Sequence, residues 1–173
     1  NPQDSAVYVD GIRLPIIYHL TGTTSVISRE IVRQVDYLPG GYSAEFGRAL
    51  SGTVDVKTKT KFDAPKLVLS TDILDAQVWF EGALGKKKHG FAIGARRSYI
   101  DLFIPLLTAG SGITVEPIYY DYQLKWLPTL GPKDTLEFFI FGFQDILRVG
   151  QSADQATSAD PSFQRDLSTI YQP

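Results

Sequence analysis

Apolar and polar residues alternate along most of the chain after residue 65, with the period of two that is typical of β-strands. The alternation is clearest over residues 120–129, where one face carries Tyr120, Tyr122, Leu124, Trp126 and Pro128. The opposite face of this segment carries Asp121, Gln123, Lys125, Leu127 and Thr129. This alternation predicts five strands, at residues 66–73, 76–84, 91–100, 118–130 and 135–149.

The connections between these expected strands differ in length. Three are short and polar, at residues 74–75, 86–89 and 131–134, and two are long, at residues 105–117 and from 150 to at least 162. Short turns on one side and long loops on the other are typical of outer-membrane barrels. A soluble sandwich would bury the apolar face of segment 120–129. A membrane barrel would show that face to lipid and keep Asp121, Gln123 and Lys125 in a wet lumen.

Aromatic and charged residues refine the membrane interpretation. Trp126 lies near the short-turn end of its expected strand and Tyr120 near the long-loop end, where interfacial aromatic residues gather. Segment 135–145 is less regular, because its phenylalanines occupy both faces. The strand expected at 91–100 carries Arg96 and Arg97. Since a charge on a lipid face costs about 2–4 kcal/mol at the midplane, at least one of the two must face the lumen or lie near a rim.

The first 62 residues carry shorter elements. We expect four strands, at residues 6–9, 12–14, 35–38 and 52–59. A glycine-rich turn separates the last two of them. Ser25 or Ser28 is placed to cap a short helix over residues 27–34, which has apolar residues on one side. A unit of this size holds little core of its own and needs a neighbour to bury against.

Composition narrows the class of protein. Seventeen basic and nineteen acidic residues give a net charge of -2, so no polybasic nucleic-acid surface is expected. The chain has no cysteine, which removes disulfides and thiolate metal sites. No apolar run is long enough for a membrane-spanning helix. The lack of methionine and of a signal peptide before Asn1 indicates a fragment or a processed chain.

Sequence motifs for catalysis or metal binding are missing. Residues 41–45, GYSAE, lack the final glycine of a nucleophile elbow. His19 and His89 lie too far apart in sequence for a metal-ligand motif, and the carboxylates are scattered. The KKKH run at 86–89 lacks the pattern of a phosphate loop and is expected to be a solvated turn. We therefore expect no enzymatic activity, no catalytic residues, no metal site and no cofactor.

Two groups of motifs resemble one known family. The segments VYVDGIRLP (7–15) and VDYLPGGYSAEFGRALSGTVDVKTK (35–59), with a helix expected between them, resemble the plug domain of TonB-dependent outer-membrane receptors in order and spacing. The segments DAQVWFEGALG (75–85), RRSYIDLF (96–103) and YYDYQLKW (119–126) resemble the first barrel strands of such receptors from myxobacteria-like Gram-negative bacteria.

The resemblance implies a mainly β fold, namely a fragment of a plugged transmembrane β-barrel of roughly 22 strands with a small mixed α/β plug portion at its N-terminus. Residues 1–62 would be the C-terminal part of the plug, and residues 63–173 the first five barrel strands with two long extracellular loops. Five strands cannot close a barrel, and open edges are not tolerated in lipid. The chain alone would therefore be neither a pore nor a transporter.

The resemblance also implies a location in the outer membrane of a Gram-negative bacterium, in contact with its lipid, and uptake of a scarce ligand. TonB would supply the energy through a segment missing from this chain. The ligand would be a siderophore, cobalamin, a sugar or a peptide, and no nucleic acid is implied. Two alternatives stay open: a structural or secretion-linked plug-and-barrel component that does not transport, and a soluble β-rich binding module.

Particular residues receive roles from the same resemblance. The plug loop that would contact a ligand carries Leu14, Pro15, Tyr18 and His19, although a buried, hydrogen-bonded His19 is the alternative. The charges that would pair plug with barrel are Glu45, Arg48, Glu81, Arg96 and Arg97, where the alternative is surface pairs worth less than about 1 kcal/mol. The glycines that would shape the plug turn, or serve as ordinary turn glycines, are Gly40, Gly41, Gly47 and Gly52.

Overall fold

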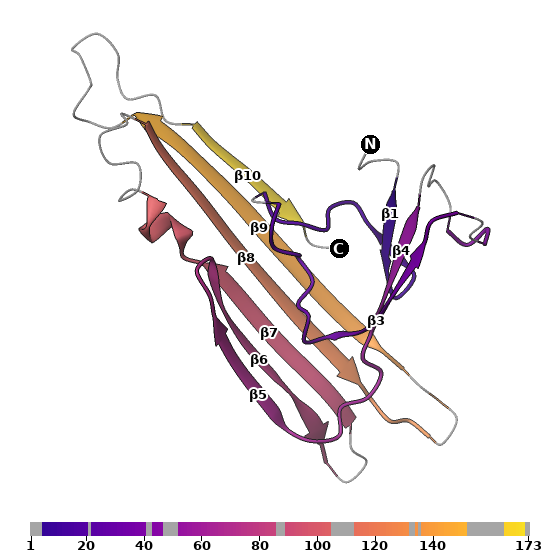
Figure 1. Ribbon diagram of the computed structural model, residues 1–173. Coiled ribbons are helices and arrows are strands. Elements are labelled where there is room, and N and C mark those ends of the chain that lie inside the picture. The colour runs from indigo at the N-terminus through magenta and orange to yellow at the C-terminus, as the bar shows by residue number, and fades with distance from the viewer. Residues whose placement is uncertain are drawn as a thin grey trace.

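The computed structural model of the chain describes residues 5–20, 22–40, 43–46, 52–85, 89–104, 113–131, 134, 136–151 and 165–171. Its strands form two sheets (Figure 1). One sheet has four strands in the order β2-β1-β4-β3, and the other has six in the order β10-β9-β8-β7-β6-β5. We call the described residues up to 62 the N-terminal unit, and the six-stranded sheet the large sheet.

The small sheet is built on a tight hairpin. β1 (Ala6–Val9) and β2 (Ile12–Leu14) are joined by Asp10 and Gly11, which have φ values of 48° and 82°. A two-residue hairpin turn needs positive φ at both positions, and Asp and Gly adopt that backbone readily. β1 then pairs in parallel with β4 (Thr53–Thr58), whose other edge pairs with a fourth strand. The four strands expected in this part are all present.

The helix expected over residues 27–34 is absent, and β3 (Val32–Leu38) occupies its second half. Ser25 Oγ and Ser28 Oγ each accept a hydrogen bond from the backbone N–H two residues further on. Such local bonds compete with helical ones and favour a turn. β3 then pairs antiparallel with β4. The prediction of a mixed α/β unit is therefore wrong for the described residues, which form a β unit.

The large sheet is an antiparallel meander in which every strand pairs with the next one along the chain. Its strands are β5 (Lys66–Thr71), β6 (Asp75–Leu84), β7 (His89–Ser98), β8 (Ile113–Leu127), β9 (Phe138–Gln151) and β10 (Arg165–Tyr171). The first five match the strands that the alternation predicts, and β10 is additional. β8 begins inside a predicted long loop, and a short 3-10 helix, η2 (Ile100–Leu102), follows β7.

The strands of the large sheet run between two ends. β5, β7 and β9 finish at the end that lies uppermost in Figure 1, which we call the upper end, and β6 and β8 finish at the lower end. The N-terminal unit lies against one face of this sheet, which we call the inner face, and the opposite face is the outer face. No helix within the described ranges is long and apolar enough to cross a bilayer.

The two faces of the large sheet differ in chemistry and in burial. The inner face buries the polar residues Asp75, Glu81, Ser98, Asp121, Gln123, Lys125 and Asp145. The outer face exposes the large apolar residues Leu67, Leu69, Val78, Phe80, Ile93, Tyr122, Leu124, Trp126, Phe138 and Ile140. The inner face also holds the buried apolar residues Trp79, Phe141 and Phe143. The sheet therefore differs from that of a soluble protein chiefly in leaving a continuous apolar face exposed.

Apolar contact between the unit and the sheet centres on Trp79, whose side chain is buried. Gly94 lies opposite Trp79 on β7 and leaves room for the indole, since a Cβ at this position would lie 2.3 Å from Trp79 Cε3. The N-terminal unit contributes to this core Val9, Leu14, Val26, Ile27 and Ile31. Residues that are paired from strand to strand form rows across the sheet. The row of Trp79 and Gly94 lies between the row of Asp121 and the row of Lys125, so polar groups flank the apolar centre on both sides.

Candidate functional site

The candidate site is the polar interface between the N-terminal unit and the inner face. His19, in the loop after β2, reaches this face with a fully buried side chain. Its Nε2 lies 3.1 Å from Asp121 Oδ2 on β8, and its Nδ1 lies 2.6 Å from Asp145 Oδ1 on β9. The ring stacks on Tyr119 at a centroid distance of 4.3 Å and meets Phe143 edge-on. One side chain thus ties a loop to two adjacent strands.

The protonated form of His19 is the one that fits this site. A neutral imidazole has a single N–H, so one of its nitrogens would face a carboxylate with a lone pair. Burial is the largest single effect on the pKa of His19 and lowers it. The hydrogen bonds and charges of Asp121 and Asp145 together outweigh burial and raise this pKa above 6.5. The hydrogen-bond geometry and the raised pKa thus both favour the protonated form of His19 at this interface.

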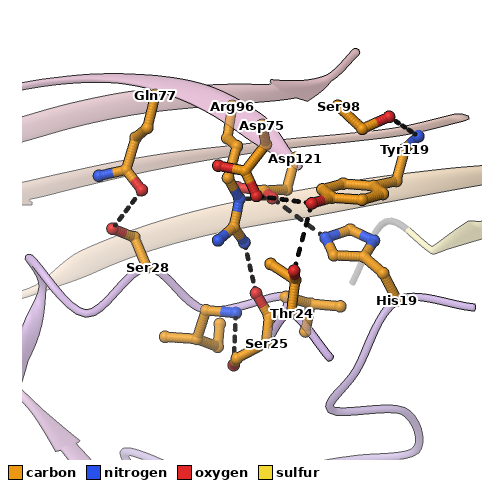
Figure 2. Close-up of polar contacts among 12 residues, drawn as sticks. His19, Thr24, Ser25, Ser28, Asp75, Gln77, Arg96, Ser98, Tyr119 and Asp121 are labelled. Atoms are coloured by element: carbon orange, nitrogen blue, oxygen red, sulfur yellow. Dashed lines mark hydrogen bonds and ion pairs between the residues drawn. The ribbon is translucent and has the colours of Figure 1, made fainter. Parts of the chain in front are cut away.

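Arg96 supplies a second positive charge beside His19. Its Nε donates to Asp121 Oδ2 at 2.7 Å, and its Nη2 donates to the backbone carbonyl of Ser25 in the N-terminal unit. Figure 2 shows Arg96 extending from the large sheet toward that loop. Arg96 and the protonated His19 thus face the carboxylates of Asp121 and Asp145 in a site from which water is largely excluded. Pairing of this kind is what makes buried charges tolerable.

Further hydrogen bonds complete this part of the interface. The Tyr119 hydroxyl donates to Asp75 Oδ2 at 2.5 Å and lies 3.2 Å from Thr24 Oγ1. Ser28 Oγ donates to Gln77 Oε1 at 3.3 Å. These contacts are drawn in Figure 2. We call the upper cluster the residues His19, Arg96, Tyr119, Asp121 and Asp145.

A second polar group lies nearer the lower end. Lys125 has a fully buried side chain, and its Nζ lies 2.6 Å from Glu137 Oε1 and 3.6 Å from Asp10 Oδ2. Nζ also donates to Thr58 Oγ1. Asp10, in the β1–β2 turn, accepts hydrogen bonds from the backbone N–H and the hydroxyl of Thr58. We call Asp10, Thr58, Lys125 and Glu137 the lower cluster.

Glu81 extends the interface beside the lower cluster. Lys59 Nζ, just after β4, lies 2.9 Å from Glu81 Oε2, and Trp79 Nε1 donates to the same oxygen at 2.8 Å. The Glu81 carboxylate therefore joins the N-terminal unit to the apolar centre of the interface. Separating a buried or partly buried ion pair of this kind leaves an uncompensated charge. This cost keeps the two parts of the molecule together.

The loop predicted to contact a ligand divides into buried and exposed residues. Leu14 and His19 are buried, and Pro15 and Tyr18 are exposed. Ligand contact by His19 does not fit the structure, because both ring nitrogens are taken by carboxylates and solvent does not reach them. Leu14, Pro15 and Tyr18 line a groove of about 670 Å³ together with Arg13. For these three residues ligand contact stays a prediction.

The charged residues predicted to pair lie on different faces. Glu81 and Arg96 lie on the inner face, where Glu81 meets Lys59 and Arg96 bonds with Ser25, both in the N-terminal unit. Arg97 lies on the outer face instead, with its guanidinium carbon 5.5 Å from the centre of the Tyr120 ring. The expectation was that at least one of these two arginines faces a lumen or lies near a rim, and Arg96 lies on the face that the N-terminal unit covers.

The remaining predicted residues belong to the glycine-rich turn. Glu45 is exposed and accepts a hydrogen bond from Ser43 Oγ at 2.7 Å. Gly52 is tightly packed, since a Cβ there would lie 3.2 Å from the Tyr37 ring, whereas nothing lies near Gly40. Three of the predicted residues lie outside the described residues: Arg48, Gly41 and Gly47.

Sequence reasoning missed several residues of the interface. The alternation in β8 placed Asp121, Gln123 and Lys125 on one face, as observed, but predicted that they would be wet. They are buried against the N-terminal unit instead. The sequence pattern gives no role to Asp10 or Asp145. Asp145 is a carboxylate that follows a run of phenylalanines in a strand of membrane type. An ionisable residue in such a segment usually has a buried partner or a function, and this is the signal that could have identified Asp145.

No other chemistry is evident in the part of the chain that the structure describes, where no three His, Asp or Glu side chains are arranged to hold a metal ion. No family model, no curated protein and no solved structure matches the chain. The features of the molecule that bear on function are therefore its fold, the exposed apolar face of the large sheet and the two polar clusters.

Proposed function

We propose that the chain is part of a TonB-dependent outer-membrane receptor, with the N-terminal unit as the C-terminal part of its plug and the large sheet as part of its barrel wall. The observation that carries the proposal is the arrangement of the large sheet, which exposes a continuous apolar outer face and buries charged and polar side chains around the apolar centre of its inner face. In water, an apolar face of this extent would be an aggregation hazard. In a bilayer, the same face lies against hydrocarbon.

The order of residues on the outer face supports the proposal. Strand register places in one row Leu67, Phe80, Ile93, Leu124 and Ile140. The row on the lower side holds Gly82, Phe91, Trp126 and Phe138. Rows on the upper side hold Tyr122, and then Arg97, Tyr120 and Gln144. An apolar centre flanked by aromatic and then polar residues fits a bilayer with its two interfaces.

The inner face supports a plugged lumen. Charges in a lumen need partners, and the N-terminal unit supplies Lys59 to Glu81, Asp10 to Lys125, and His19 to the upper-cluster aspartates. In the proposed receptor, these contacts hold the plug unit at rest. Force transmitted through TonB must separate them before a ligand passes. The free edges of β5 and β10 would pair with further strands, because open edges are not tolerated in lipid.

Replacing Leu124 with arginine tests the proposed lipid contact. Leu124 lies in the central row of the outer face, where a charge is expected to cost about 2–4 kcal/mol of barrel stability if that row lies at the bilayer midplane. The folded fraction of the full-length protein in lipid vesicles should fall accordingly during urea titration.

The matched control is Gln144→Arg, which places the same charge on the same face two rows farther toward the upper end. Near an interface, the cost of an arginine falls to about 0–1 kcal/mol. Equal costs for the two variants, or no cost for Leu124→Arg, would exclude hydrocarbon contact at the central row and with it the proposed function.

A further inference from the structure

Residues 59–65, which we call the tether, connect the end of β4 in the small sheet to the start of β5 in the large sheet. The tether reaches the large sheet at its lower end (Figure 1). Its exposed residues are Thr60, Lys61, Asp63, Ala64 and Pro65. Phe62 is only 4% exposed, and of residues 59–65, all of which the structure describes, it alone is buried. A single aromatic side chain thus fixes the middle of an otherwise exposed segment.

The Phe62 ring packs on the inner face at a row that includes small residues. Strand register places Ala83, Gly90 and Leu127 in this row, across β6, β7 and β8. A Cβ on Gly90 would lie 3.2 Å from Phe62 Cδ2, so the glycine leaves room for the ring. Phe62 belongs to the hydrophobic core, and Leu127 packs against that core. The burial of apolar surface that holds Phe62 depends on no charge and on no protonation state.

The position of Phe62 limits how far the N-terminal unit can travel. The start of the tether belongs to that unit, because the Lys59 N–H donates to the Ile31 carbonyl at 2.8 Å. An extended chain advances at most about 3.6 Å per residue, so the three steps from Lys59 to Phe62 span about 11 Å. By the same measure the whole tether spans about 25 Å. A fixed Phe62 therefore shortens the reach of the unit by more than half.

The polar contacts between the unit and the large sheet depend on charge, unlike the packing of Phe62. The two polar clusters and the pair of Lys59 with Glu81 each include a cation whose removal leaves carboxylates unpaired. The apolar centre at Trp79 lies between rows of polar residues, so it loses its closure against water when these groups separate.

We infer that Phe62 is the fixed point of a hinge: when the polar clusters separate, the N-terminal unit swings about the tether at the lower end and stays beside the large sheet. This inference goes beyond the proposed function and does not rest on it, because it concerns only the contact between the unit and the sheet.

The test measures distances between pairs of spin labels in the full-length protein, in a non-ionic detergent, by pulsed electron paramagnetic resonance. These 173 residues contain no cysteine, so within them labels attach only to cysteines that are introduced. The upper pair replaces Tyr18 and Ile73, and the lower pair replaces Arg33 and Thr129; all four side chains are exposed. Arg33 follows Val32, which pairs with the last residue of β4, so the lower pair reports on the region of the tether.

The released variant combines His19→Gln, Lys59→Met and Lys125→Met, which removes a cation from each cluster and from the pair with Glu81. Its upper-pair distances should broaden. Its lower-pair distance should shift by less than about 11 Å, because Phe62 still fixes the tether. Adding Phe62→Ala should extend that shift toward about 25 Å, the reach of the free tether.

Two further variants keep the test decisive. Gly90→Val displaces the Phe62 ring from the sheet side and should extend the lower-pair shift in the same way, which gives a second reading if Phe62→Ala does not fold. Leu130→Ala is the matched control, because Leu130 is an apolar residue of the lower end that is exposed. Added to the released variant, it should change neither distance.

Three results would overturn the hinge. The first is a lower-pair shift that is equally large with and without Phe62. The second is an upper pair that stays narrow in the released variant, because the polar clusters would then not hold the upper side. The third is an effect of Leu130→Ala equal to that of Phe62→Ala. The vesicle experiment with Leu124→Arg and Gln144→Arg tests the proposed function separately, so either can fail without the other.

Discussion

Replacing Lys125 with methionine is expected to loosen the N-terminal unit from the large sheet by about 3 kcal/mol, at the lower end of the cost of breaking a buried ion pair. Methionine preserves most of the apolar stem, while the charge and its contact with the Phe139 ring are lost. Asp10 and Glu137 then lack their shared cation. Both are partly exposed and regain some water, which is why the lower end of the range applies.

Amide hydrogen exchange in the full-length protein measures this loosening. The N–H of Thr58 donates to Asp10, so its exchange reports directly on the lower cluster. A loss of about 3 kcal/mol corresponds to exchange roughly a hundredfold faster if exchange occurs through local opening. Lys61→Met is the control, because Lys61 is an exposed lysine whose pair with Asp63 is worth less than about 1 kcal/mol. Equal protection in Lys125→Met and the unaltered protein would contradict a role for Lys125 in docking.

The upper cluster is expected to make docking dependent on pH. The folded-state pKa of His19 is raised. A histidine whose pKa is raised in the folded state stabilises docking through its protonated form. That contribution is complete when the pH is below the unfolded-state pKa of about 6.5, and it is lost as the pH rises through the folded-state pKa. The groups that face His19 are Asp121 and Tyr119 from β8, Asp145 from β9, Arg96 from β7, and Asp75 through Tyr119. Docking should therefore weaken as the pH rises from about 6.5 through the raised pKa of His19.

His19→Gln separates this effect from other titrations. The variant removes the cation between Asp121 and Asp145, which is expected to cost about 3–5 kcal/mol of docking at neutral pH and to abolish the alkaline loss. Exchange of the amides that follow His19, corrected for intrinsic pH dependence, provides the measurement. His89→Gln is the control, since His89 lies away from the interface and accepts a bond from the Thr129 N–H. An alkaline loss that persists in His19→Gln would assign the titration to another group.

The alternation of residues was enough to predict five strands and the two faces of the large sheet, because a period of two fixes which side chains share a face. It did not predict β10, because residues beyond 149 were interpreted as a loop. The helix expected at 27–34 failed for a physical reason. Apolar spacing suited a helix, but Ser25 and Ser28 form local turns, and the β-branched residues after them pair with β4.

The pairing at the interface was beyond the reach of the sequence. His19 lies 102 positions from Asp121 and 126 from Asp145, and no local pattern links them. The sequence did indicate which β8 residues share a polar face. What it lacked was the partner: only the fold shows that the N-terminal unit covers Asp121 and Lys125 and replaces water around them.

The most direct test of the central claim uses the two tryptophans of the chain. Trp126 lies on the outer face and is 45% exposed, whereas Trp79 lies on the inner face and is 0% exposed. In vesicles of brominated lipid, bromine quenches the fluorescence of tryptophans that contact lipid. The amount of fluorescence lost should be smaller in Trp126→Phe than in the unaltered full-length protein, and it should be unchanged in Trp79→Phe. That result places the apolar face in lipid. Equal quenching in Trp126→Phe and the unaltered protein, or reduced quenching in Trp79→Phe, would contradict the account.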